Sequence, residues 1–352
     1  MIDLSVVIPS YENAALLEGC LAALARARAA HPALRFEVLV VDNGSRDGSA
    51  ERAAASTLGV RLIALARNRG FAAAVNMGLR ARHGRHVLLL NSDAEIEPGV
   101  LVGGVAWLDG EADVGVVGAG LLHPDGREQR SVHALPGWTS ELLPDRFVRW
   151  GRRRLRDRAS AAPRGRARAG AVPVGGEGGG AHRSGARAIG GGQDVEAVRG
   201  AVFFMAGDLV EALGGLDEGY FFFLEETDYC ARVRDAGRRV VYAPGLRAIH
   251  RLGASSKARA PLATRIEYER SLDRFLARRR GPGVARLVRG LRLLRGVGGL
   301  VLLGLAAPLS GRLRSRLRER AGLLLWHLRG RPAEPVLADV LASRASGEGT
   351  PI

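Results

Sequence analysis

The chain has 352 residues, which is enough for one large or two modest domains with a hydrophobic core. Its formal net charge of +16 comes almost entirely from arginine, since Lys257 is the only lysine, and it calls for anionic partners such as lipid head groups, nucleotide phosphates or nucleic acid. The two cysteines, Cys20 and Cys230, are far apart in the sequence, which argues against a disulfide-stapled scaffold and indicates a reducing compartment.

The first 120 residues alternate short apolar runs with amphipathic segments. Strands are predicted at 4–8, 36–41, 60–65, 87–90 and 114–118, and helices at about 14–24, 49–58, 71–79 and 100–108. This alternation predicts a right-handed, mostly parallel, Rossmann-like sheet with flanking helices. The N-terminus enters its first strand without a basic segment, so we expect no secretory signal and a cytoplasmic location.

Polar residues follow several of these strands at the point where each leaves the sheet. We expect Pro9 to close the first strand, and the second ends at Asp42. The apolar run Val87–Leu90 stops at Asn91, Ser92 and Asp93. A carboxylate beside an amide and a hydroxyl suits a hard divalent cation that is shared with a substrate phosphate. The same three residues could instead cap the helix that opens near Pro98.

The amino-acid composition changes in the second half of the chain. Residues 121–131 read as a hairpin, and 149–194 are rich in Arg, Gly and Ala with almost no large apolar residues. That segment is predicted to be a disordered insertion, either a solvated linker or a basic tail that binds RNA or membrane. Order is expected to return with a strand at 195–206, a short helix at 208–213, a helix at 225–236 and a strand at 238–242.

Two further groups carry possible chemistry. Glu225, Glu226 and Asp228 open a helix, with Glu225 and Asp228 on one face and Glu226 on another. One of them could be the carboxylate base that a hydroxyl nucleophile needs, although acidic residues in a first helical turn also complement the helix dipole. His250 follows the last strand and is either a metal ligand beside Asp93 or a packed histidine.

Residues 259–332 form a basic, amphipathic helical region. Its most apolar part, 297–309, is shorter than a spanning helix needs and contains Pro308 and several glycines. We expect these helices to lie on an anionic membrane surface, and the alternative is a helical hairpin packed on the catalytic domain. Residues 333–352 are predicted to be a flexible tail.

The motifs as a set resemble family 2 glycosyltransferases of the GT-A fold. The resemblance rests on VVIPSYEN, VVDNGSRDGS, RNRGFAAAVNMGL, LLLNSDAEI and the stretch from Val198 to Ser256. Within the family the chain is most similar to bacterial rhamnosyltransferases of cell-wall and surface-polysaccharide assembly. The resemblance implies an α/β GT-A domain over residues 1–258, interrupted by the insertion at 149–194.

The resemblance also implies a set of site residues. A nucleotide-sugar site would comprise Pro9, Tyr11, Glu12, Asp42, Asn68, Gly70, Asn91 and Ser92. Asp93 and His250 would bind Mg²⁺ or Mn²⁺ at an Asp-x-Asp-like motif in which Asn91 replaces the first acid. The catalytic base would be Glu226, where the family usually has an Asp, with Asp228 as the second candidate.

The expected reaction is therefore an inverting sugar transfer from a nucleotide-diphosphate sugar, with dTDP-rhamnose as the donor that the subgroup suggests. The acceptor would be a hydroxyl of a glycan or lipid-linked molecule at the inner face of the cell membrane, in cell-envelope polysaccharide synthesis. Two alternatives stay open. A sugar-nucleotide nucleotidyltransferase would need a Gly-rich triphosphate loop after the first strand, where this chain has PSYE. A non-enzymatic RNA-binding protein would use the arginines, but these lie outside the folded core and no RNA-binding module is present.

Overall fold

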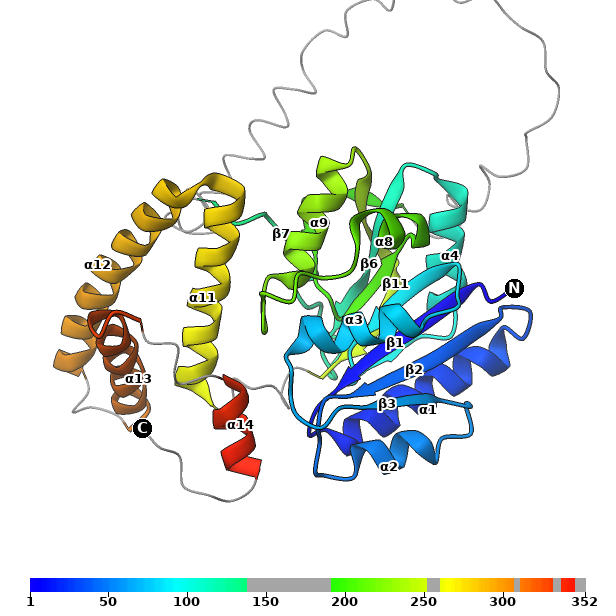
Figure 1. Ribbon diagram of the computed structural model, residues 1–352, viewed down its shortest axis with the longest axis horizontal. Coiled ribbons are helices and arrows are strands. Elements are labelled where there is room, and N and C mark those ends of the chain that lie inside the picture. The colour runs from blue at the N-terminus through cyan, green and yellow to red at the C-terminus, as the bar shows by residue number, and fades with distance from the viewer. Residues whose placement is uncertain (138–190, 252–259, 307–310, 332–336, 346–352) are drawn as a thin grey trace, which may run out of the picture.

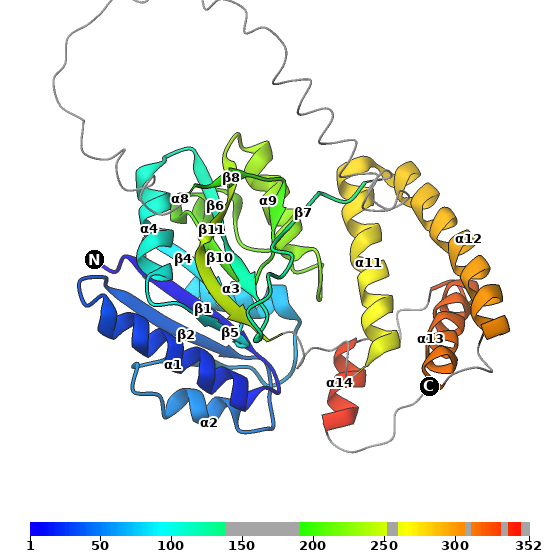
Figure 2. The ribbon, with the colours of Figure 1, turned by 180° about the vertical axis from the view of Figure 1, so that it is seen from behind.

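The computed structural model describes residues 1–137, 191–251, 260–306, 311–331 and 337–345, and it is an α/β domain with a helical unit beside it (Figures 1 and 2). The strands of its main sheet are β1 (Leu4–Ser10), β2 (Phe36–Asp42), β3 (Arg61–Ala64), β4 (His86–Leu90), β5 (Ala94–Ile96), β6 (Val114–Leu122), β8 (Gln193–Asp194), β10 (Val202–Met205) and β11 (Arg239–His250). Strands β7 (Val132–His133) and β9 (Ala197–Val198) form a separate pair.

Helices cover both faces of the sheet, and the C-terminal helices form a separate unit beside it (Figures 1 and 2). The α/β domain has α1 (Ala14–Ala30), α2 (Ser49–Ala54), α3 (Phe71–Ala81), α4 (Val100–Gly110), α8 (Gly207–Leu213) and α9 (Glu225–Asp235). The helical unit consists of α11 (Pro261–Arg280), α12 (Pro282–Ala306), α13 (Gly311–Leu328) and α14 (Leu337–Ala345).

The order of strands along the sheet is β3-β2-β1-β4-β10-β6-β11-β5, with β8 paired to β11. Strands β3, β2, β1 and β4 are parallel neighbours, while β10 runs antiparallel to both β4 and β6. The expected mostly parallel sheet is thus confirmed, with antiparallel members that the sequence pattern does not reveal. The carboxyl ends of β1, β2 and β4 meet at one edge, which is where ligands bind in such sheets.

The polar end of β1 extends further than expected. Pro9 lies inside β1, since the strand continues to Ser10 and pairs there with Asp42. The Ser10 carbonyl accepts a hydrogen bond from the Asn43 N–H (2.8 Å) on the β2 side. Backbone hydrogen-bonding groups of successive strand residues point to alternate neighbouring strands, so the nitrogen of Pro9 points to the β4 side, where the pairing of β1 with β4 has already ended at Val7. The missing N–H of proline therefore costs no ladder bond.

Two other expectations differ from the structure in detail. The strand expected at 195–206 is interrupted between β9 and β10 at residues 199–201, where a Cβ on Gly200 would lie 3.3 Å from Glu226. The predicted insertion at 149–194 lies outside the described residues except for its last four, which contain strand β8, so its disorder stays a prediction.

The helical unit packs on the α/β domain through α11. Leu272, Phe275 and Leu276 of α11 form a buried cluster with Tyr220 and Leu224. This packing agrees with the alternative of helices docked on the α/β domain, and among the described residues several apolar side chains of α12 and α13 stay exposed. Among the described helices, none has the length and hydropathy that a bilayer span requires.

The prediction of a flexible tail is wrong for residues 337–345, which form α14. Leu337 and Leu341, one helical turn apart, are buried against Ala260 and Ala263. Tyr11 of the β1–α1 turn packs partly against the same cluster. A short apolar pair in a polar tail is too weak a local signal to predict a helix, and the tertiary contact stabilises it.

Candidate active site

Asp42 ends β2 with one carboxylate oxygen used and one without a partner. Its Oδ2 accepts a hydrogen bond from the backbone N–H of Ser45 (3.0 Å), which holds the turn after the strand. Its Oδ1 is buried and has no hydrogen-bond partner. A buried acceptor without a partner at the carboxyl edge of a sheet is suited to a hydroxyl or N–H donor of a ligand.

The turn after β1 is tied to the turn after β4 by side chains. Ser10 Oγ donates to Asn13 Oδ1 (2.7 Å), and Asn13 Nδ2 donates to Ser92 Oγ. Ser92 therefore has a role in joining the two turns. Asn13 was missed by the sequence analysis, because an Asn before a helix reads only as a cap.

Glu12 acts as a brace between the same turn and the loop after β2. It has a left-handed backbone (φ 51°), its N–H donates to Ser45 Oγ (3.0 Å), and its Oε1 accepts from the Arg46 N–H (2.8 Å). Its carboxylate is thus engaged by the protein. The role of Glu12 in this structure is to hold the shape of the site.

Asn68 and Gly70 are held in place by Asn43, a residue that the sequence analysis did not select. Asn43 Nδ2 donates to Asn68 Oδ1 (3.1 Å) and to the Gly70 carbonyl (3.1 Å), and Asn43 Oδ1 accepts from the Arg69 N–H (2.9 Å). Asn68 Oδ1 also accepts from the Gly70 N–H (2.9 Å). All of these bonds fix the loop before α3 against the end of β2.

Gly70 is where this loop meets the segment that precedes α9. Its φ of 92° lies in a region that side chains avoid, and a Cβ there would be 2.7 Å from the Phe221 carbonyl oxygen. The Phe71 N–H donates to that same carbonyl (2.8 Å). Phe223 and Leu224 also have positive φ values, 74° and 67°. Strained backbone of this kind is concentrated at functional sites and is held by the surrounding contacts.

Asp93 and His250 are brought together from sequence positions 157 residues apart, and His250 Nε2 lies 3.2 Å from Asp93 Oδ1. Strand β11 places His250 opposite Ala94 of β5, next to the end of β4. His250 Nδ1 lies 3.1 Å from Gln129 Oε1, while the Gln129 amide also donates to the His250 carbonyl. An N–H at Nδ1 would leave the Nε2 lone pair directed at Asp93. Gln129 was missed because it follows the turn of the predicted hairpin at 121–131 and belongs to no motif.

The donor set at this turn fits a divalent cation that retains open positions for a substrate. Asp93 offers a carboxylate oxygen, His250 an imidazole nitrogen, and the nearby Asn91 Oδ1 is buried without a partner. Among the described residues, no group of three or more His, Cys, Asp and Glu side chains is arranged to hold a metal. Two protein ligands completed by water and phosphate oxygens are the arrangement that Mg²⁺ commonly adopts.

The three acidic residues of α9 have different surroundings. Asp228 is buried and lies 3.0 Å from Arg232 Nε and 3.5 Å from Arg279 Nε, so it is part of a structural ion-pair network. Glu225 is buried with one oxygen unpartnered, and burial, with the adjacent Glu226 charge, raises its pKa well above the ordinary value. Burial also raises the pKa of Glu226, which has no ion pair among the described residues.

Glu226 adjoins the turn after β4 through the strand break at Gly200. A Cβ at Gly200 would lie 3.3 Å from the Glu226 Cβ, and the next residue, Ala201, accepts a hydrogen bond from the Asn91 N–H (2.9 Å). The structure therefore brings Asn91, Asp93, His250 and Glu226 to one end of the sheet. Only a small side chain at residue 200 leaves room for the glutamate.

Comparison with known proteins finds similarity to glycosyltransferases in both sequence and fold. Residues 5–161 match the family model described as glycosyl transferase family 2. The dolichyl-phosphate beta-glucosyltransferase of Drosophila melanogaster is 34% identical over 101 residues, which are 26% of this chain and 31% of the relative. The match thus spans less than a third of that relative's length.

A longer match covers most of the chain. The N-acetylglucosaminyl-diphospho-decaprenol L-rhamnosyltransferase of Mycobacterium tuberculosis H37Rv is 27% identical over 296 residues, 78% of this chain and 84% of the relative. Among solved structures, the mannosyltransferase PcManGT from Pyrobaculum calidifontis, in complex with GDP-Man and Mn²⁺, superposes with a TM-score of 0.50 at 18% identity, over 92% of this chain and 87% of that one. The likeness in fold confirms the GT-A architecture.

Proposed function

This chain carries a family 2 glycosyltransferase domain of the GT-A fold, and on that premise we propose that it is an inverting glycosyltransferase that uses a nucleotide-diphosphate sugar. The observation that supports this most is the Asp93–His250 pair, supported by Gln129, at the same sheet end as Glu226. A site of this kind offers a place for a diphosphate leaving group and a base for an acceptor hydroxyl.

In the proposed reaction, Glu226 removes the proton of the acceptor hydroxyl as its oxygen attacks the anomeric carbon. The bond between the anomeric carbon and the diphosphate oxygen breaks in the same displacement, and its electron pair leaves with the nucleoside diphosphate. Glu226 suits this role because burial raises its pKa, which makes it a stronger base than an exposed glutamate. Asp228 is less suited, since two arginines hold its carboxylate.

The leaving group carries negative charge that must be neutralised. Asp93 and His250 would hold Mg²⁺ or Mn²⁺, which supplies positive charge to the diphosphate when bound. Gln129 orients His250 for this contact, while the free Oδ1 of Asp42 is placed for a donor group of the nucleoside. The proposed donor site also includes Pro9, Tyr11, Asn68 and Gly70, which border the same turns.

We further propose rhamnose as the sugar, dTDP as its nucleotide, and a lipid-linked glycan as the acceptor, in cell-envelope polysaccharide synthesis. The support is the mycobacterial rhamnosyltransferase, which aligns over 78% of this chain. A cytoplasmic location at the membrane surface would follow from such an acceptor. Neither the nucleotidyltransferase nor the RNA-binding alternative gains support from the comparisons.

A thermal-shift panel tests this proposal directly. The protein is melted with dTDP, UDP, GDP and ATP, each with and without Mn²⁺, in parallel with Asp93→Ala and with Asp125→Ala, an exposed hairpin-tip control. We expect one diphosphate to raise the melting temperature, and only with Mn²⁺. At about 100 times its dissociation constant the ligand adds about 2.7 kcal/mol to the free energy of unfolding. Loss of that shift in Asp93→Ala alone supports the donor site, and the absence of any shift in the unmodified protein contradicts it.

A further inference from the structure

Two of the four arginines of helix α12, Arg289 and Arg292, turn toward α11. Arg289 Nε lies 3.0 Å from Asp273 Oδ2, and Arg292 Nη2 lies 2.6 Å from Glu269 Oε1, both carboxylates belonging to α11. The two acids are 14% and 6% exposed. The side of α12 that carries these two arginines is therefore packed against α11.

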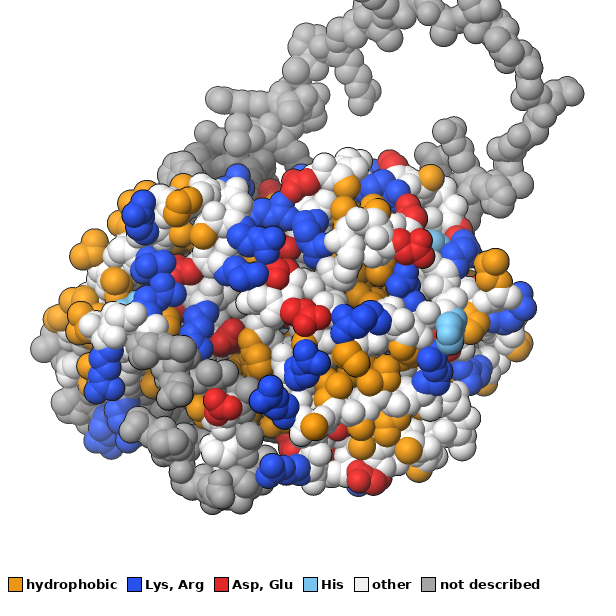
Figure 3. Space-filling model, viewed as in Figure 1, with side chains coloured by type: hydrophobic (Ala, Val, Ile, Leu, Met, Phe, Trp, Pro, Cys, Tyr) orange, Lys and Arg blue, Asp and Glu red, His pale blue; other side chains and the backbone are white. Residues whose placement is uncertain are grey.

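The opposite side of α12 is apolar and uncovered. Leu287, Leu294, Val297 and Val301 are 55%, 70%, 46% and 61% exposed. At 3.6 residues per turn they fall within an arc of about 80°. Six of the eight large hydrophobic residues exposed in the described chain lie on α12 and α13, and Figure 3 shows hydrophobic side chains gathered at this edge of the molecule, beside arginines. Exposure of such an apolar face to water is unfavourable, and contiguous apolar faces of this kind mark sites that bind an apolar partner.

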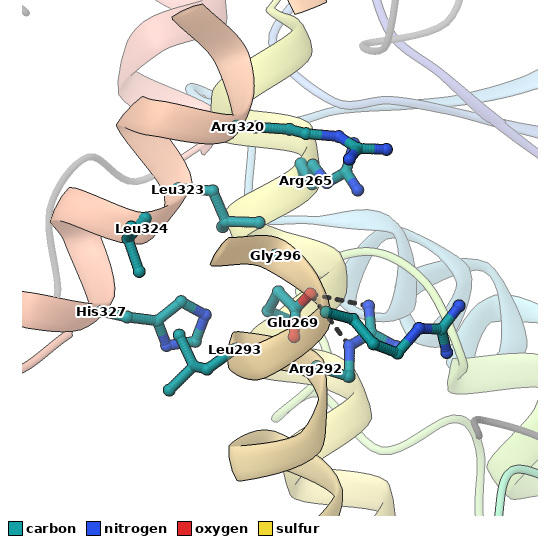
Figure 4. Close-up of a pocket in the computed structure, with 10 residues that line it drawn as sticks. Arg265, Glu269, Arg292, Leu293, Gly296, Arg320, Leu323, Leu324 and His327 are labelled. Atoms are coloured by element: carbon teal, nitrogen blue, oxygen red, sulfur yellow. Dashed lines mark hydrogen bonds and ion pairs between the residues drawn. The ribbon is translucent and has the colours of Figure 1, made fainter. Parts of the chain in front are cut away.

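A cavity between α11, α12 and α13 is lined by positive charge and is therefore suited to an anionic ligand. It has a volume of about 400 Å³, and four arginines line it: Arg265, Arg292, Arg295 and Arg320. Glu269 is the one carboxylate among its described lining residues, and Arg292 already binds it (Figure 4). His327, also in the lining, has a buried Nδ1 without a hydrogen-bond partner. Arg265 also pairs with Glu319 (3.3 Å), so these four arginines and two carboxylates carry a net positive charge that would match a phosphate.

We propose that α11, α12 and α13 form a docking unit for a bilayer that contains anionic phospholipid. The outward face of α12 enters the acyl region, and the arginines of the cavity bind a lipid phosphate. The inference rests on the proposed function only for its membrane-bound acceptor. A second copy of the chain fits less well, because Arg286 and Arg295, which flank the apolar face, would meet their own copies in a chain of net charge +16.

Vesicle co-sedimentation tests the proposal with the full chain. Vesicles of phosphatidylcholine alone and of phosphatidylcholine with phosphatidylglycerol are compared for four proteins: the unmodified chain, Leu294→Ser/Val301→Ser, Arg265→Gln/Arg320→Gln, and the control Val102→Ser, which changes an exposed valine on α4. We expect the unmodified protein and the control to bind the mixed vesicles. The α12 pair should lower the partition coefficient by about tenfold or more, and the arginine pair should remove the preference for anionic vesicles.

Three results would overturn the proposal. The first is equal binding by the control and the α12 variant. The second is no vesicle binding together with a dimer, seen by light scattering, that the α12 variant loses. The third is a melting shift with inorganic pyrophosphate that needs Arg265 and Arg320 although no vesicles bind, because the cavity would then hold a free anion.

The nucleotide panel, repeated on the same variants, separates the two proposals. Retained nucleotide shifts with lost vesicle binding, in a variant whose own melting temperature is unchanged, assign the α12 face to membrane docking alone. Vesicle binding by a protein that responds to no nucleotide would contradict the proposed function and leave the docking unit intact.

Discussion

Gln129 Oε1 lies 3.1 Å from His250 Nδ1, although the two residues are 121 positions apart in the chain. This contact favours the tautomer with its proton on Nδ1, which leaves Nε2, the nitrogen that faces Asp93, free to bind a cation. Gln129→Leu removes it, and we expect the Mn²⁺ concentration for half-maximal activity to rise about 10- to 100-fold. A titration of sugar transfer with Mn²⁺ measures the effect. Gln193→Leu, on the exposed strand β8, is the matched control, and equal metal responses of the two variants would contradict the role of Gln129.

The acids of α9 allow the base to be separated from a structural carboxylate. Glu226→Gln should lower the rate of transfer by about 10²- to 10⁴-fold while the nucleotide-induced melting shift is kept, because only the proton acceptor is lost. Asp228→Asn should instead lower the free energy of unfolding by about 1–3 kcal/mol, because Arg232 loses its charged partner and Arg279 keeps only Asp235 among the described carboxylates. Single-turnover transfer and urea denaturation report these two effects. If Asp228→Asn instead lost the transfer rate and Glu226→Gln only lost stability, the base would be Asp228.

Gly70 gives a test of the contact between the loop before α3 and the segment before α9. Gly70→Ala places a Cβ 2.7 Å from the Phe221 carbonyl oxygen, whereas Gly59→Ala, also at positive φ (63°), meets nothing within 4 Å. We expect Gly59→Ala to cost about 1–2 kcal/mol for its left-handed backbone alone. Gly70→Ala should cost more and should also weaken the nucleotide shift, since the loop must move. Denaturant unfolding and the nucleotide panel check this, and equal losses would mean that the close approach has no role.

The buried carboxyl group of Glu225 should make the stability of the fold depend on pH. Burial, the Glu226 charge and the Glu267 charge raise its pKa well above 4.5, so the folded chain binds this proton more tightly than the unfolded chain does. The stabilisation is fully present below pH 4.5 and is lost as the pH rises through the folded pKa. Glu225→Gln stays neutral, so its melting temperature relative to the unmodified protein should rise with pH across this window. Glu128→Gln, at an exposed position, should show a flat difference. A flat difference for Glu225→Gln as well would show that its pKa is not raised.

Local patterns in the sequence were enough for the α/β core and for the edge that holds the site. The run Val87–Leu90 was expected as a strand and forms β4 (His86–Leu90), and the helical spacing of Phe71, Val75 and Leu79 matches α3. These predictions succeed because burial on both faces of a parallel strand and on one face of a helix leaves a periodic imprint on neighbouring residues. Parallel strands also place their carboxyl ends together, so Asp42 and Asp93 could be assigned to one edge.

Which side chains are engaged by the protein and which are available to a ligand depends on tertiary contacts. Asp228 and Glu226 look alike in sequence, but Arg279, 51 residues downstream, reaches the first and not the second. The helix α14 and the support of His250 by Gln129 likewise depend on segments far apart in the chain. Such contacts form when the whole chain closes on itself, and no local periodicity records them. Local sequence patterns are enough to predict the elements of this domain and the edge where its polar residues gather, whereas long-range packing sets the chemistry of each one.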